Sequence, residues 1–234
     1  MNQPEAGLSE GVRQLRFQRP PGATTVLLIR HGESAPVREG EPFSLVGGHG
    51  DPELDPRGRD QAERIAARLA GGADEISAIY VTNLRRTAET AAPLARRLGL
   101  DPIVEARLRE VYLGEWEGGL YRIRILENGP VAQQMVAEER WDVIPGAEPD
   151  HDFATRVRSG INHVASRHPD QTVAVFTHGG VIGRAMAEAA GSRPFAFLGA
   201  DNASITRFVV AGDRWVVRGY NDTAHLERAT APLR

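Results

Sequence analysis

Two histidines in this sequence each follow an apolar run and precede glycine. His31 comes after "TVLLI" and Arg30, and His178 comes after "TVAVFT" and before Gly179 and Gly180. Ligands of open parallel sheets bind outside the carboxyl ends of the strands. Glycine lets the backbone come close to such a ligand, and the start of a helix near Gly180 favours a ligand with negative charge. Either histidine alone would fit a core or capping role, but the repeated pattern favours an anion-binding site.

Charged residues follow two other segments of extended character. "VTNLRRTAETA" places Arg85 and Arg86 at the start of a helix that follows a strand, and "LREVYLGEWEG" places Glu110 in a turn. Guanidinium groups grip phosphoryl oxygens, and a carboxyl group can exchange protons with a reacting group. Histidine and glutamate are also acceptable metal ligands, but two arginines in the same place favour an anion. We therefore expect neither a metal nor another cofactor.

Composition excludes several function classes. The 234 residues carry a net charge of −3, so no overall field favours nucleic acid or an acidic membrane. The chain has no cysteine, which excludes disulfides and thiol nucleophiles. No stretch has the character of a signal peptide or a membrane span. We expect a cytoplasmic protein with no nucleic-acid or membrane partner.

Strand and helix patterns alternate along the chain, which predicts an α/β fold with a mostly parallel sheet. A hairpin near the end, turned at Gly212–Asp213, is expected to supply an antiparallel edge. Asn83 is a candidate N-cap, Pro93 a candidate kink, and the segment 121–150 is expected to be partly helical. The expected strands are 25–29, 76–81 and 172–177, and the expected helices are 59–71, 83–99, 153–168 and 179–191, with a long loop over 35–58.

The expected domain division is simple. Residues 1–22 are predicted to be a loosely ordered lead-in, closed by Pro20, Pro21 and Gly22. A single domain is predicted over 23–227, followed by a tail over 228–234.

The sequence resembles the histidine phosphatase superfamily, the phosphoglycerate-mutase-like proteins, over residues 25 to 218. Its motifs occur in the family's order: "RHG", "GHGDPELDPRGRDQA", "TNLRRTAETA", "LREVYLGEWEG", "HGG" and "NASITRF". Within these motifs, the arginine of the family pattern is Arg86 rather than Arg85. The glutamate of the family pattern is Glu110.

The resemblance implies a three-layer α/β/α fold and a metal-independent phosphatase. It implies that His31 attacks phosphorus and becomes phosphohistidine, that Glu110 is the general acid and base, and that His178 is the third catalytic residue. The implied phosphate-binding residues are Arg30, Arg86, His178, Ser34 and Gly179. Many members have a Trp–Asn pair after "RHGES", whose Asn helps to hold the phosphate, whereas Pro36 and Val37 stand in this sequence.

Two alternatives to a hydrolase stay open. A phosphoglycerate-type mutase carries extra segments between the glutamate and the second histidine, and this interval looks short here. A catalytically idle module that binds phosphorylated ligands would not need His31, Glu110 and His178 together.

Substrate contacts are expected from the loop 35–50 and the segment 118–150, in which Tyr121, Arg122 and Arg124 are candidates for binding a small phosphorylated molecule. His49 is a candidate for the rim of the pocket. The apolar hairpin is a candidate homodimer interface, and the oligomeric state stays open. All histidines other than His31 and His178 are expected at the surface: His49, His151, His163, His168 and His225.

Overall fold

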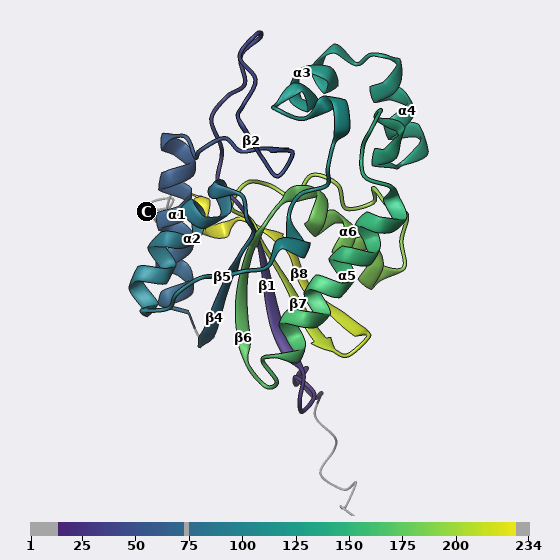
Figure 1. Cartoon of the computed structure of the whole chain (residues 1–234). Coiled ribbons are helices and arrows are strands. Elements are labelled where there is room, and N and C mark those ends of the chain that lie inside the picture. The colour runs from purple at the N-terminus through teal and green to yellow at the C-terminus, as the bar shows by residue number, and fades with distance from the viewer. Residues whose placement is uncertain (1–13, 73–74, 228–234) are drawn as a thin grey trace, which may run out of the picture.

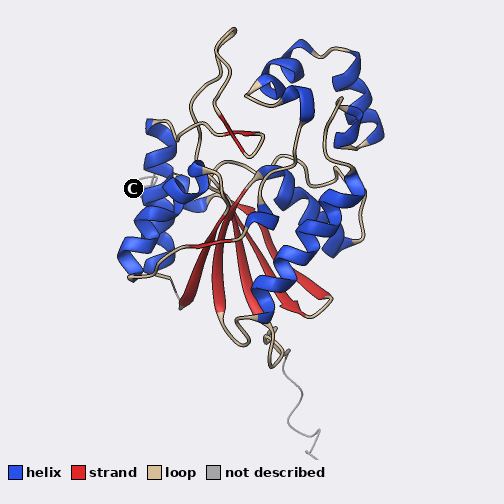
Figure 2. Ribbon diagram, in the orientation of Figure 1, coloured by secondary structure: helices blue, strands red, loops and turns tan. Residues whose placement is uncertain are grey.

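A six-stranded sheet forms the centre of the protein in the computed structural model, which describes residues 14–72 and 75–227 (Figures 1 and 2). The strand order is β5-β4-β6-β1-β7-β8. β5, β4, β6 and β1 are parallel, whereas β7 is antiparallel to β1 and β8 to β7. The prediction of a mostly parallel sheet with an antiparallel hairpin at one edge is confirmed. The strands are β1 (Thr24–Arg30), β4 (Ile76–Val81), β5 (Ile103–Val104), β6 (Thr172–Thr177), β7 (Ile205–Ala211) and β8 (Arg214–Asp222).

Helices cover both faces of the sheet, which gives the three layers that the resemblance implied (Figure 1). In β1, Val26 and Leu28 pack in one apolar core with α5 (Asp150–Ser166) and α6 (Gly179–Ala190). Leu27 and Ile29 point to the other face and pack with α1 (Pro56–Ala70) and α2 (Arg85–Leu98). All four side chains are fully buried, so β1 is the apolar centre of the fold that its sequence predicted.

The starts of two helices differ from the prediction. α1 begins at Pro56, within the expected loop, because the Asp55 side chain accepts a hydrogen bond from Gly58 N at 2.7 Å and caps the helix. The predicted N-cap Asn83 is wrong, since α2 begins at Arg85 after Leu84. Its first N–H group instead donates to Asp51 Oδ1, at 2.8 Å. The cap therefore comes from a residue remote in sequence, which a local pattern cannot reveal.

The segments that the sequence left least defined lie beyond the carboxyl ends of the strands (Figure 1). Residues 35–58 include the small sheet of β2 (Leu45–Val46) and β3 (His49–Gly50). Residues 121–150 form much of α3 (Leu120–Glu127), all of α4 (Pro130–Glu138) and a short 3-10 turn, Trp141–Val143. Both segments therefore lie at the edge where a ligand is expected.

The turn at Gly212–Asp213 joins β7 to β8 as predicted. The predicted lead-in 1–22 lies partly, and the predicted tail 228–234 wholly, outside the described residues, and the domain division stays a prediction. Within residues 14–72 and 75–227, no helix is long and apolar enough to cross a bilayer.

Candidate active site

Neighbouring parallel strands bring the two histidines together. β1 and β6 pair in register, with Arg30 opposite Thr177, so that the next residues, His31 and His178, leave the sheet side by side. Their ring centroids lie 5.3 Å apart in an edge-to-face arrangement. The prediction that both strands deliver their histidines to one edge of the sheet is therefore confirmed.

The His31 imidazole is held in one tautomer. Its Nδ1 lies 2.7 Å from the carbonyl oxygen of Gly32, which can only accept, so Nδ1 carries the proton and Nε2 keeps its lone pair. Burial, together with the cations Arg86 and Arg30, holds the pKa of His31 well below its ordinary value. The ring is consequently neutral at physiological pH, which is the state that a nucleophile requires.

His178 is fully buried beside His31. Its Nε2 is 3.0 Å from Thr82 Oγ1, and its Nδ1 has no hydrogen-bond partner among the described residues. Burial and the nearby Arg86 lower the pKa of His178 as well. Arg30 Nε is likewise buried without a partner in the described part of the chain. Buried polar groups are normally hydrogen-bonded, so these two nitrogens indicate where a polar ligand would bind.

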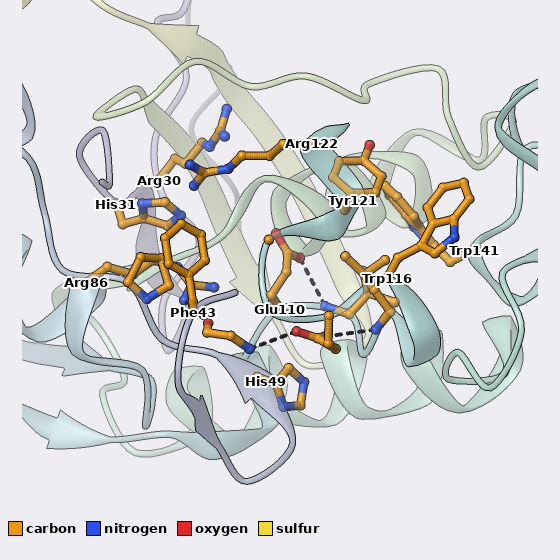
Figure 3. Close-up of a pocket in the computed structure, with 16 residues that line it drawn as sticks. Arg30, His31, Phe43, His49, Arg86, Glu110, Trp116, Tyr121, Arg122 and Trp141 are labelled. Atoms are coloured by element: carbon orange, nitrogen blue, oxygen red, sulfur yellow. Dashed lines mark hydrogen bonds between the residues drawn. The ribbon is translucent and has the colours of Figure 1, made fainter. Parts of the chain in front are cut away.

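Arg30 and Arg86 line one pocket with His31 (Figure 3). Arg30 donates to the carbonyl oxygen of Ala200, and Arg86 Nη1 donates to the carbonyl oxygen of Gly50 at 2.9 Å. Burial lowers the pKa of Arg86 to about 10, so it stays charged at neutral pH. Within residues 14–72 and 75–227, neither guanidinium forms an ion pair with a carboxylate. The positive charge in the pocket is therefore available to an anionic ligand.

Glu110 faces His31 and the arginines across the same pocket (Figure 3). Its Oε1 accepts a hydrogen bond from Val111 N at 3.0 Å, and its Oε2 accepts one from Gly180 N, at the start of α6, at 3.2 Å. A Cβ atom on Gly180 would lie 2.5 Å from Glu110 Oε1. The "HGG" sequence thus provides the space in which this carboxylate lies.

Four aromatic side chains among the described residues line the pocket. Tyr121 was a candidate from its sequence, whereas Phe43, Trp116 and Trp141 were not predicted to line the pocket. Only Trp116 had a signal, as part of "GEWEG", because Phe43 and Trp141 come from segments without a regular apolar period. Burial and the charge on Glu110 raise the pKa of Tyr121 to about 12, so its hydroxyl stays protonated.

Arg122 in α3 reaches across the pocket mouth. Its Nη2 donates to Ser34 Oγ at 2.7 Å and its Nη1 to the carbonyl oxygen of Ala35 at 2.8 Å, while its guanidinium carbon lies 5.5 Å from the centre of the Phe43 ring. Arg122 therefore contacts the segment that follows "RHG", where Pro36 and Val37 offer no polar side chain. Arg124 instead pairs with Glu127 outside the pocket.

Other predicted residues have mixed placements. Ser34, His178 and Gly179 do not line the pocket: His178 is fully buried behind it, next to His31, and a Cβ on Gly179 would lie 3.4 Å from Arg30 Nε. The expectation of His49 at the surface is wrong, because its ring packs against Tyr112 and is buried, although it does line the pocket that its loop was expected to rim. The other histidines lie outside the pocket: His151 is exposed, and the partly exposed ones are His163, His168 and His225. In the described part of the chain, no group of three His, Cys, Asp or Glu side chains is placed to hold a metal ion.

Comparison with known proteins identifies a family and several relatives. The model of the histidine phosphatase superfamily (branch 1) matches residues 26–223. Phosphoglycerate mutase-like protein 4 of Arabidopsis thaliana is 32% identical over 206 residues, covering 86% of each chain. Phosphoserine phosphatase 1 of Hydrogenobacter thermophilus is 33% identical over 205 residues, covering 86% of this chain and 93% of the relative. The structure of mycobacterial glucosyl-3-phosphoglycerate phosphatase superposes with a TM-score of 0.69 at 28% identity, covering 86% of this chain and 100% of that one.

Proposed function

Because this chain belongs to the histidine phosphatase superfamily (branch 1) and is a phosphomonoester hydrolase, we propose that the substrate transfers its phosphoryl group to His31. Nε2 of His31 attacks phosphorus, an N–P bond forms, and the P–O bond to the leaving group breaks. A covalent intermediate of this kind divides one slow displacement into two faster ones. The observation that carries the proposal is the His31 Nδ1 contact to the Gly32 carbonyl oxygen, which leaves the lone pair on Nε2.

Glu110 is proposed to move the protons. In the first step its carboxyl group gives a proton to the leaving oxygen of the substrate, and in the second step the carboxylate takes a proton from the attacking water. The water oxygen then bonds to phosphorus, the N–P bond breaks, and phosphate leaves with His31 restored. The position of Glu110 across the pocket from His31 supports this role (Figure 3).

Arg30, Arg86 and His178 are proposed to hold the phosphoryl oxygens. The unpartnered Arg30 Nε and His178 Nδ1 support this assignment, as does the absence of ion pairs on the two arginines within the described residues. Such donors stabilise the charge that develops on the transferred group. Of the remaining phosphate-binding candidates, Gly179 would act through its close approach to Arg30 and Ser34 through its bond to Arg122.

We further propose that the substrate is a small phosphorylated metabolite whose leaving group packs against Phe43, Tyr121 and the two tryptophans. The relatives named for phosphoserine and for glucosyl-3-phosphoglycerate support a substrate of this size. The predictions of a cytoplasmic location and of no nucleic-acid or membrane partner stay predictions, and the oligomeric state stays open, with the hairpin as a candidate homodimer interface.

A comparison of wild type with His31→Ala tests the mechanism. Wild type should release phosphate from an aryl phosphate, and mass spectrometry at alkaline pH should detect a PO3 adduct on His31. No release above the His31→Ala background would favour an idle binding module. Isomerised phosphoglycerate without free phosphate would favour a mutase.

A further inference from the structure

Glu117 connects two segments of chain at the wall of the pocket. It follows the 3-10 turn Gly114–Trp116 and, like Glu110, lines the pocket. Its Oε1 accepts a hydrogen bond from Leu113 N at 3.0 Å, and its Oε2 accepts one from Gly50 N at 2.8 Å (Figure 3). Within residues 14–72 and 75–227, no cation forms an ion pair with this carboxylate. Both of its oxygens are therefore used to fix backbone.

The second of these contacts leads to Arg86. Gly50 N donates a hydrogen bond to Glu117 Oε2, and the carbonyl oxygen of Gly50 accepts one from Arg86 Nη1 at 2.9 Å. Arg86 has a buried side chain and lies beside His31, whose pKa it helps to lower. The position of the Gly50 carbonyl consequently constrains the orientation of this guanidinium.

The loop that contains Gly50 is docked closely on the residues around Glu117. Phe43 N donates to the carbonyl oxygen of Gly118 at 2.8 Å, and a Cβ atom on Gly50 would lie 3.2 Å from Gly118 Cα. Next to Gly50 in the same loop, the Asp51 side chain accepts a hydrogen bond from Arg85 N, the first N–H group of α2. This loop therefore touches both the start of the helix and the guanidinium of its second residue.

We propose that Glu117 is a positioning residue that holds Arg86 in the orientation required to bind a phosphoryl group. Its carboxylate fixes the Gly50 peptide, and that peptide fixes one nitrogen of Arg86, which leaves the other donors of the guanidinium directed at the ligand. The catalytic consequence rests on the proposed function. The effect on phosphate binding does not require turnover and can be measured separately.

The test compares Glu117→Ala with Glu115→Ala, a matched control because Glu115 is exposed in the same turn. Affinity for inorganic phosphate is measured by calorimetry, and kcat and KM are measured with p-nitrophenyl phosphate. Loss of an orienting bond to a charged group should weaken phosphate binding about tenfold in Glu117→Ala, whereas Glu115→Ala should match wild type. Glu117→Gln keeps the shape of the side chain and one acceptor oxygen, so its loss of phosphate affinity should be smaller. It replaces Glu117→Ala in the comparison if the alanine variant does not fold.

A double-mutant cycle distinguishes positioning from a general structural effect. In an Arg86→Ala background, Glu117→Ala should cause no further loss of phosphate affinity, because the group through which it acts is absent. Additive losses, or unchanged affinity in the single variant, would overturn the inference. So would a Glu117→Gln protein that binds phosphate normally but does not turn over, because Glu117 would then be a proton donor itself. A wild-type protein that neither binds phosphate nor hydrolyses the ester would instead refute the proposed function.

Discussion

The carboxylate of Glu110 is held by Gly180, whose backbone N–H group donates to its Oε2 at 3.2 Å. The relationship is steric as well as polar, since any side chain at Gly180 would begin 2.5 Å from the other carboxylate oxygen. The second glycine of "HGG" therefore helps to place Glu110, the proposed general acid, whereas from the sequence we expected only that it would admit a ligand.

Replacing Gly180 with alanine should displace Glu110 and lower kcat about a hundredfold, because a misplacement near 1 Å has an effect of that size on a reacting group. Gly129→Ala is the matched control, since a Cβ there meets nothing within 4 Å. Steady-state kinetics with p-nitrophenyl phosphate give the measurement. Wild-type turnover in Gly180→Ala would mean that the position of Glu110 is not critical.

Acid should destabilise the fold through His31. Burial, Arg86 and Arg30 hold the folded-state pKa of His31 well below its ordinary value, so below about pH 6.5 the unfolded chain binds a proton that the folded chain does not. The free energy of unfolding should then fall as the pH falls. When the pH falls from about 7.5 to about 5.5, the free energy of unfolding of His31→Asn should decrease by about 1 kcal/mol less than that of wild type.

Urea unfolding at the two pH values measures this difference. His151→Asn is the control, because His151 is exposed. An equal loss in wild type and His31→Asn would show that the buried ring does not cause the acid sensitivity.

Arg122 should contribute to substrate binding, since it crosses the pocket mouth next to Phe43 and Ser34. Removing a hydrogen-bonded guanidinium from this position should raise the KM of Arg122→Ala about tenfold. Arg124→Ala, two residues along α3 and paired with Glu127, should leave the KM unchanged. Equal KM values for both variants would place the substrate elsewhere in the pocket.

Arg156 should be important for stability. Its guanidinium bonds to Glu148 and to the backbone carbonyl oxygens of Arg107, Arg109 and Glu110, at distances of 2.6 to 2.8 Å. Only 13% of each side chain in the Arg156–Glu148 pair is exposed. Removing one partner of a buried pair is strongly destabilising, so Arg156→Met should lower the free energy of unfolding by about 3 kcal/mol.

Chemical denaturation checks this value, with Arg158→Met as the control. Arg158 lies two residues further along α5 and is 52% exposed, so its replacement should change stability by less than about 0.5 kcal/mol. A loss in Arg156→Met no larger than in this control would contradict the expectation.

The features that were predictable from the sequence are those encoded locally. Apolar runs identified the buried strands, and the residue that follows each run identified His31 and His178. The position of Glu110 followed from the family motif, because its turn gives no helical or strand period of its own.

Contacts between segments remote in sequence were not predictable. Asp51 caps a helix that begins 34 residues later, and no local pattern reports this. Phe43 and Trp141 belong to one pocket only because their segments fold over the strand ends. Ser34, expected to hold phosphate, accepts a hydrogen bond from Arg122 of α3, which no local pattern reports.

The place of β6 between β1 and β4 has a consequence for biosynthesis. During translation, β1, the strand that leads to His31, has no neighbour on that side until the ribosome has passed residue 177. The nascent chain therefore cannot bind phosphate tightly before its central sheet closes. A ligand that binds only the completed fold stabilises it by mass action, so the concentration of a phosphomonoester substrate would help to determine how much newly made protein stays native.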